Sequence, residues 1–306
     1  MSEVVEGLVS ILVPSYNHSK YVEQCLNSIK EDSYRKKQLV IIDDGSKDNS
    51  IEIIKEWVEV NSVHFEYPII FRHRPNKGIT KTLNEMLDLA TGEYVITLAS
   101  DDFLINNSIE NRVGCLEKRD DKFAVFSDCI IVDNDNRKTA DSCLEEFYNV
   151  NKVEFMDEDT LALSLILKWC VPGPVLMMKK SIFDLIGKYD ENSVVEDREL
   201  YLKLLKGNSL VFLDEIVAAY RIHGDNSISI NKRNITIGVL NSEEKLLKEF
   251  KGINRLALKS QIFIKKSSKF LDYNILIRIL YRMLGRGLEL VGKTVLKNKL
   301  QSIKNR

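Results

Sequence analysis

Two glycine-rich phosphate-binding signatures are absent from this 306-residue chain. No glycine lies between Gly7 and Gly45, so the first turn after a strand cannot carry the GxGxxG signature of a dinucleotide-binding fold. The GxxxxGK(S/T) pattern of a P-loop does not occur either. These absences exclude both classes of nucleotide-binding loop.

Cysteines and long apolar runs are also scarce. The chain has five cysteines, an odd number, and no CxxC pair, which excludes a disulfide framework and a zinc knuckle. No apolar run reaches the roughly 18 residues that span a bilayer, and the N-terminus carries acidic residues where a signal peptide would carry positive charge. We therefore expect reduced thiols and a cytoplasmic protein.

Acidic residues are rare in one part of the chain only. Of the 44 Lys and Arg and the 45 Asp and Glu, residues 251–306 hold 14 basic and two acidic residues, which leaves 30 and 43 in the first 250. A surface for an anionic partner is therefore expected in this tail. We expect no nucleic-acid partner.

Strand-like and helix-like segments alternate in the first hundred residues. Apolar strand-forming runs and helically spaced apolar residues follow one another at 8–13, 21–29, 39–42, 50–60, 68–72, 79–90 and 93–97. This alternation predicts a Rossmann-like, mostly parallel sheet with helices on both faces. Right-handed crossovers bring the carboxyl ends of such strands to one sheet edge, where open α/β sheets bind ligands.

Polar residues follow the first two strands. Pro14, Tyr16 and Asn17 offer an aromatic face and an amide group to a base or ribose. After the second strand, Asp43 and Asp44 can accept a hydrogen bond from a base N–H or a ribose hydroxyl. Ordinary turn and helix N-cap chemistry is the alternative for both segments.

Asp101 and Asp102 follow the strand at 93–97. Two adjacent carboxylates repel each other unless a cation or hydrogen-bond donors neutralise them, and a divalent metal that carries substrate phosphates would do so. The alternative is that one of them caps the next helix.

The second half of the chain is less regular. A strand is expected at 123–128, polar loops over an active site at 133–160, and strand-like runs at 210–212 and 216–221. Glu196 and Asp197 begin a helix, where acidic residues suit the helix dipole, and a catalytic base is the functional alternative. His223 lies in the polar stretch YRIHGDNS, and a purely structural role is its alternative.

Motifs along residues 8–230 occur in the order and spacing of a known family. They are VSILVPSYN (9–17), VIIDDGS (40–46), NKG (76–78), TGEYVITLASDD (91–102), GKYDE (187–191), Glu196-Asp197 and YRIHGDNS (220–227). The chain thus resembles the family-2 glycosyltransferases with the GT-A fold, of the type found in bacterial polysaccharide biosynthesis. The resemblance does not reach beyond about residue 232.

The resemblance implies roles for matching residues. Asp102 and His223 would bind Mn²⁺ or Mg²⁺, although Ala99 stands where many relatives have Asp. Asp197 would be the general base. A nucleotide-sugar donor, a UDP- or dTDP-sugar, would contact Pro14, Tyr16, Asn17, Asp44, Lys77, Asp101 and Arg221.

The implied activity is inverting transfer of a sugar to a hydroxyl of a glycan or lipid-linked glycan. A sugar hydroxyl does not ionise at neutral pH, so a carboxylate must take its proton, and a metal offsets the charge of the departing diphosphate. A single displacement needs no second carboxylate as nucleophile. The alternatives are a sugar-phosphate nucleotidyltransferase, which would need a glycine-rich loop after the first strand, and an inactive scaffold, against which intact Asp102 and Asp197 argue.

We expect a GT-A catalytic domain at 1–231, with a nucleotide-sugar-binding half at 1–105 and an acceptor-side half at 106–231. Residues 232–306 are expected to form a basic amphipathic helical extension, because apolar residues recur there at helical spacing between Lys and Arg. Its apolar face would lie on an anionic membrane, pack on the catalytic domain, or form a homodimer. The membrane alternative would place the protein on the inner face of the cell membrane.

Overall fold

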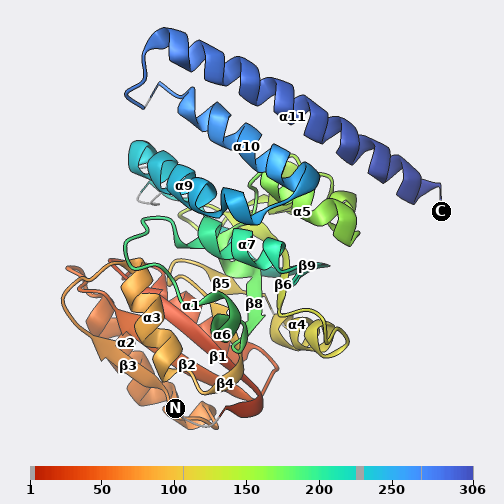
Figure 1. Cartoon of the computed structure of the whole chain (residues 1–306). Coiled ribbons are helices and arrows are strands. Elements are labelled where there is room, and N and C mark those ends of the chain that lie inside the picture. The colour runs from red at the N-terminus through yellow and green to blue at the C-terminus, as the bar shows by residue number, and fades with distance from the viewer. Residues whose placement is uncertain (1–3, 106, 225–230, 270, 306) are drawn as a thin grey trace. The chain divides into compact units, whose positions relative to one another are not determined.

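The computed structural model describes residues 4–105, 107–224, 231–269 and 271–305 (Figure 1). The chain forms two compact units. The first is made of Met1–Asn149, Val171–Asn192 and Phe212–His223, and the second of Val150–Cys170, Ser193–Val211 and Gly224–Arg306. The end of the YRIHGDNS motif, residues 225–227, lies outside the described residues.

A mixed sheet is the core of the first unit. Its nine strands in the described chain are β1 (Val5–Ser15), β2 (Lys37–Asp43), β3 (Ile70–His73), β4 (Gly92–Thr97), β5 (Phe103–Leu104), β6 (Ala124–Val132), β7 (Lys138–Ala140), β8 (Leu176–Lys179) and β9 (Leu210–Arg221). The order across the sheet is β3-β2-β1-β4-β8-β6-β9-β5, and β7 pairs with β6. The predicted Rossmann-like sheet is confirmed for β3-β2-β1-β4, whose pairs are parallel. The pairs β4–β8, β6–β8, β6–β7 and β5–β9 are antiparallel.

The parallel half is built from strands that the apolar pattern predicts. All seven residues of β2 are buried, as expected of a strand flanked on both edges and covered on both faces. Gly92 begins β4 next to β1, and a Cβ there would come within 2.5 Å of the Leu8 carbonyl oxygen. Glycine therefore permits this close approach of two backbones.

Helices flank the sheet in the first unit. They are α1 (Val22–Glu31), α2 (Ser50–Asn61), α3 (Ile79–Leu89), α4 (Ser108–Glu117) and α6 (Ile182–Ile186). The first three lie where the helical spacing predicts them. Short helical turns lie at Ser62–His64, Cys143–Phe147 and Gly173–Val175 in this unit, and at Lys152–Phe155 and Leu247–Glu249 in the second unit.

The second unit is helical. It contains α5 (Glu158–Leu167), α7 (Glu196–Lys206), α9 (Lys232–Leu246), α10 (Gly252–Lys266) and α11 (Ile275–Lys304), with α10 and α11 side by side (Figure 1). The described part of the chain contains no helix with the length and apolarity to span a bilayer.

One strand prediction is corrected. The runs at 210–212 and 216–221 form the single strand β9 rather than two strands. The polar residues between them do not interrupt it, because Asp214 is exposed and Glu215 accepts a hydrogen bond from Asn111 at 2.6 Å.

Candidate active site

Three strand ends meet at one edge of the sheet. Because β1, β2 and β4 are parallel, their carboxyl ends deliver three loops to the same place. The Asp44 amide donates to the Ser15 carbonyl at 2.8 Å, and the Ser100 amide donates to the Pro14 carbonyl at 3.3 Å. The loops after all three strands are therefore hydrogen-bonded to one another, as the sequence predicts.

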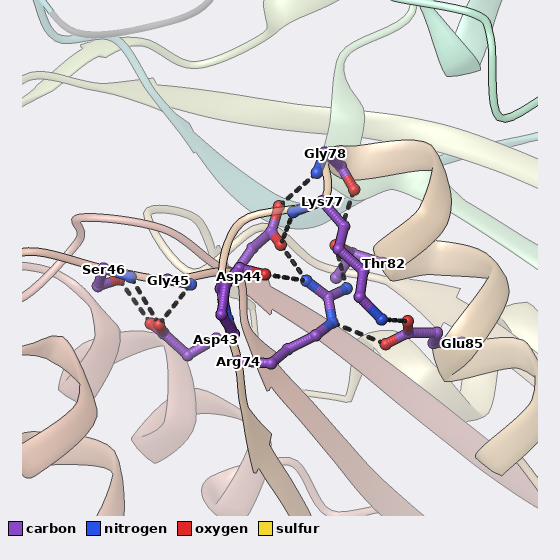
Figure 2. A network of polar contacts seen from close by, with 10 residues as sticks. Asp43, Asp44, Gly45, Ser46, Arg74, Lys77, Gly78, Thr82 and Glu85 are labelled. Atoms are coloured by element: carbon purple, nitrogen blue, oxygen red, sulfur yellow. Dashed lines mark hydrogen bonds and ion pairs between the residues drawn. The ribbon is translucent and has the colours of Figure 1, made fainter.

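Asp44 is the centre of a polar network at this edge (Figure 2). Its Oδ1 accepts the Lys77 amide at 2.7 Å, and its Oδ2 accepts the Gly78 amide at 2.9 Å. The Arg74 guanidinium forms an ion pair with Asp44 and donates to Glu85 at 2.8 Å. The network fixes the turn before α3 against the end of β2.

Asp43 and Asp44 have different tasks. Asp43 Oδ1 accepts the amides of Gly45 and Ser46 at 3.1 and 2.8 Å, which is the turn chemistry expected after β2 (Figure 2). Asp44 instead forms an ion pair with Arg74, a residue that was not predicted from the sequence to belong to the site. The signal was its position, because Arg74 follows β3 as Asp44 follows β2.

The other predicted donor contacts lie nearby and differ in exposure. The Tyr16 side chain is exposed, with an exposed fraction of 45%. Asn17 has a left-handed backbone (φ 56°), and its side-chain oxygen accepts the Lys47 amide at 2.7 Å. The Lys77 ammonium donates to Glu85 at 2.7 Å, which leaves its backbone amide as the group that holds Asp44.

Asp101 lies between two histidines. His223 Nε2 is 2.9 Å from Asp101 Oδ2, and His18 Nδ1 is 3.7 Å from Asp101 Oδ1. His18 Nδ1 is also 2.8 Å from Ser100 Oγ. One ligand atom from each of His18, Asp101 and His223 lies within 4.8 Å of the others, a spacing that allows a shared metal ion.

Asp102 is buried beside Asp101, and its hydrogen-bond partner lies at the end of β9. Its Oδ1 accepts the Arg221 amide at 2.9 Å. Burial and the neighbouring Asp101 charge raise the pKa of Asp102 well above its usual range. For Asp101, burial raises the pKa, but the hydrogen bond from His223 and the nearby His18 outweigh it and lower the pKa. Neither aspartate caps α4, whose N-cap is Asn107.

Arg221 holds the loop that carries both aspartates. Its buried guanidinium donates to the carbonyls of Asp101 and Asp133 at 2.8 and 2.9 Å and to Gln24 Oε1 at 2.8 Å. It also lies over the Tyr21 ring, 4.6 Å from the centroid. Arg221 was predicted to contact the nucleotide-sugar donor, and in the structure its guanidinium is bound by groups of the protein itself.

Asp197 lies in the second unit, in the first turn of α7. Burial raises the pKa of Asp197, against the opposing effect of the Arg198 amide, which donates to Asp197 Oδ1 at 2.6 Å. Burial and the adjacent Asp197 raise the pKa of Glu196 to about 7. The pair thus places two carboxyl groups with raised pKa values at one helix start.

Arg198 anchors that helix start in the second unit. Its guanidinium donates to Glu243 Oε1 at 2.7 Å and to the Leu165 carbonyl at 3.1 Å, and it lies 5.0 Å from the centroid of the Trp169 ring. Glu243 is fully buried and also accepts from Lys265 at 3.0 Å. Arg198, which directly follows Asp197 in the sequence, is therefore held in place by several contacts within the second unit.

His18 is a candidate ligand that was not predicted from the sequence. The structure places the predicted ligand His223 with Asp101 and His18, and it places the predicted ligand Asp102 against the Arg221 amide. His18 directly follows the motif VSILVPSYN, and that adjacency to a strand-end loop was the available signal.

Known proteins resemble this chain in sequence. An uncharacterized glycosyltransferase of Rickettsia typhi is 25% identical over 263 residues, which cover 85% of this chain and 76% of that protein. The hyaluronan synthase of Pasteurella multocida is 27% identical over 234 residues, which cover 74% of this chain and 22% of the synthase. Another relative, an uncharacterized glycosyltransferase of Rickettsia felis, is 26% identical, and the match covers 87% of this chain but 43% of that longer protein.

Solved structures and a family model complete the comparison. A mannosyltransferase from Pyrobaculum calidifontis, solved with GDP-Man and Mn²⁺, has a TM-score of 0.63 at 16% identity and covers 97% of this chain and 83% of that one. S. aureus TarS 1–349 with UDP-GlcNAc has a TM-score of 0.55 at 14% identity and covers 96% of this chain and 92% of that one. Residues 10–183, more than half of the chain, match the model for Glycosyl transferase family 2. The chain therefore belongs to glycosyl transferase family 2 and is a glycosyltransferase with the GT-A fold.

Proposed function

We propose that this enzyme moves a sugar from a nucleotide-sugar to a hydroxyl of a glycan or lipid-linked glycan, with inversion. The observation that carries the proposal is the meeting of the Asp44 network and the Asp101–Asp102 pair at one sheet edge. The solved relatives with GDP-Man and UDP-GlcNAc support a nucleotide-sugar as the class of donor.

Asp44 and Arg74 favour a UDP- or dTDP-sugar. A uracil or thymine ring presents an N–H donor next to carbonyl acceptors, and the carboxylate of Asp44 lies beside the guanidinium of Arg74 as acceptor and donor. Pro14, Tyr16, Asn17 and Lys77 are proposed to complete this side of the donor site. The exposed Tyr16 ring offers a face for stacking.

The carboxylates fit a divalent cation. Two adjacent buried aspartates, one with a raised pKa, are the arrangement that an added positive charge stabilises. We propose Asp102 and His223 as ligands of Mn²⁺ or Mg²⁺, with Asp101 and His18 close enough to take part. Imidazole donors favour Mn²⁺, because Mg²⁺ prefers oxygen ligands. When bound, the cation offsets the negative charge of the departing diphosphate.

Asp197 is proposed to remove the proton of the acceptor hydroxyl. A base is more effective when its pKa lies nearer the working pH, and burial raises the pKa of Asp197 in that direction. Arg198, anchored by Glu243, would hold the first turn of α7 and with it the carboxylate. The hydroxyl oxygen then attacks the anomeric carbon as the bond to the diphosphate breaks, which inverts the configuration.

Two further proposals concern organisation. We propose residues 1–231 as the catalytic domain, with donor and acceptor halves at 1–105 and 106–231, and residues 232–306 as an extension. The extension would bind an anionic membrane surface or a second copy of the chain. Binding to the membrane surface would place a cytoplasmic enzyme at the inner face of the cell membrane, where lipid-linked acceptors present their sugar.

Ligand binding and product analysis test the proposed activity. A panel of nucleotide-sugars with Mn²⁺ should identify the donor by thermal stabilisation, since ligand at about 100 times its dissociation constant adds about 2.7 kcal/mol. Transfer to glycan acceptors should release a nucleoside diphosphate and give a product of inverted anomeric configuration by NMR. Stabilisation without transfer would favour a scaffold, and pyrophosphate release from a nucleoside triphosphate would favour a nucleotidyltransferase.

A further inference from the structure

One face of α11 is packed within the second unit. A Cβ at Gly285 would come within 2.8 Å of the Ile264 side chain of α10, and a Cβ at Gly292 would come within 3.1 Å of Leu167 of α5. The two glycines are seven residues apart, which is close to two helical turns, so they mark one line along the helix. This line is the packed face of α11.

The opposite face of α11 is apolar and exposed. Leu276, Met283 and Leu290 follow one another at intervals of seven, with exposed fractions of 72%, 69% and 67%. Position 283 is about 200° around the helix from position 285, so this line lies opposite the packed face. The exposed large apolar residues of α11 are Ile275, Leu276, Ile277, Ile279, Leu280, Met283, Leu284, Leu290 and Val291. A continuous apolar face of this kind marks a protein or membrane contact.

A row of cations borders the apolar face. Its members are Arg282, Arg286, Lys293 and Lys297, spaced by four, seven and four residues and all exposed. This spacing keeps them on one side of the helix. Within the described chain, the guanidinium groups of Arg282 and Arg286 have no hydrogen bond or ion pair, whereas Lys293 pairs with Glu289 at 2.7 Å.

A cavity of about 400 Å³ opens beside this row, between α10 and α11. Arg282 and Arg286 line it together with the polar residues Gln261, Ser267, Ser268 and Glu289. Two guanidinium groups without protein partners next to an amide are suited to a phosphate group, because arginine donates paired N–H groups to its oxygens. The Glu289 carboxylate is offset by its pair with Lys293.

We propose that α11 lies in the surface of an anionic lipid bilayer and that this cavity takes the phosphate of a lipid headgroup. The Leu276–Met283–Leu290 line would lie among the acyl chains, with the cation row at the level of the phosphates. A second copy of the chain fits less well, because residues 251–306 would bring the same 14 cations and only two acidic residues. The proposal deepens the proposed function by choosing the partner of the extension.

Vesicle binding by the full-length protein tests the surface, and it needs neither donor nor acceptor. Vesicles of phosphatidylcholine with phosphatidylglycerol should bind the protein at low salt and release it at high salt, while phosphatidylcholine alone should not bind it. Met283→Asp should abolish binding without a change in melting temperature, because the side chain is exposed. Equal binding to both kinds of vesicle would overturn the proposal.

Paired neutral variants test the cavity. Arg282→Gln with Arg286→Gln should weaken partitioning by roughly 25-fold, because each surface cation contributes about 1 kcal/mol, or roughly five-fold. The control pair Lys251→Gln with Arg255→Gln removes the same charge from exposed positions of the same unit and should have little effect. If both double variants lose vesicle binding equally, binding depends on net charge alone, and the proposed headgroup site would be overturned.

Two measurements separate the other occupants. Inorganic phosphate should not stabilise the protein at millimolar concentration, and stabilisation that Arg282→Gln with Arg286→Gln removes, without vesicle binding, would assign a soluble phosphate ligand instead. Sedimentation should show a monomer in the absence of vesicles. A dimer that Met283→Asp dissociates would assign the apolar face to a second copy. If the phosphate or sedimentation result differs from this expectation, the proposal of glycosyl transfer stands, because none of these measurements depends on transfer.

Discussion

His223 Nε2 lies 2.9 Å from Asp101 Oδ2, although 122 positions separate the two residues in the sequence. His18 approaches the other oxygen of the same carboxylate, at 3.7 Å. One aspartate therefore joins the loop after β1 to the segment that follows β9, the last strand in the sequence.

Removal of either histidine should weaken Mn²⁺ binding. His18→Ala and His223→Ala should each raise the dissociation constant by roughly 10- to 100-fold, the range seen when groups that hold a metal site are removed. Calorimetric titration of Mn²⁺ measures this directly, with His64→Ala as the control at an exposed position. If His18→Ala binds Mn²⁺ as the unaltered protein does, His18 is not a metal ligand.

Asp102→Asn should abolish metal-dependent turnover and leave the fold intact. The amide keeps an oxygen that can accept from the Arg221 backbone but loses the charge that holds a cation. Circular dichroism and nucleoside diphosphate release with Mn²⁺ measure the two effects, with the exposed Asp135→Asn as control. Near-normal turnover in Mn²⁺ would show that Asp102 is not a ligand.

Asp197→Asn should lower turnover by roughly 10² to 10⁴ while donor binding survives, because a general base typically contributes that factor. The pH profile of the unaltered enzyme adds a second measurement. The base must be ionised, so turnover should fall as the pH drops through the raised pKa of Asp197, at a higher pH than for an ordinary aspartate. Weaker donor binding with unchanged turnover at saturation would make Asp197 a substrate contact instead.

Ionisation of Glu196 should make the protein less stable as the pH rises. Its pKa of about 7 lies above the usual value of 4.5, so the folded state binds this proton more tightly than the unfolded state between those values. The free energy of unfolding should therefore fall as the pH rises from 4.5 to 7. Urea titrations should show a smaller fall for Glu196→Gln. An identical pH dependence in both proteins would contradict the raised pKa.

The buried Arg198–Glu243 pair predicts a large effect on stability. Glu243→Gln leaves the Arg198 charge without its partner inside the second unit, and a broken buried pair typically costs about 3 to 5 kcal/mol. The neighbouring Glu244→Gln is the control, because Glu244 is exposed and its ion pair with Lys266 lies at the surface. Chemical denaturation of both variants gives the comparison. Equal stability would mean that Arg198 is satisfied by the Leu165 carbonyl and the Trp169 ring.

The parallel half of the sheet could be predicted because its signals are local. Each strand there is a short apolar run and each helix an amphipathic segment, so a few neighbouring residues suffice to identify them. The antiparallel half could not be predicted in the same way, because β8 pairs with β4 and β9 pairs with β5, strands that are distant in the sequence. Their direction depends on long-range pairing that no local period records.

The same distinction between local signals and long-range pairing applies to the candidate site. Its loops follow from strand ends, so Pro14, Asp44 and Asp102 could be named from the sequence. The pairing of His18 with Asp101, or of Arg74 with Asp44, depends on which loops meet and how their side chains turn. The roles of all these candidate site residues, including Asp197 and Lys77, and the domain boundary at 231 stay predictions.

Arg221 has a consequence for the order of folding. Its guanidinium joins Gln24, 197 positions earlier, to the Asp101 and Asp133 carbonyls. The bond to Gln24 spans 197 positions, and the bonds to the Asp101 and Asp133 carbonyls span 120 and 88. All three therefore need the closure of long chain segments, which makes them late events. A ribosome-bound chain that stops before β9 therefore contains β1 to β4 but lacks Arg221 and His223, which complete the candidate site. The candidate site can be completed only after residues up to His223 have been synthesised.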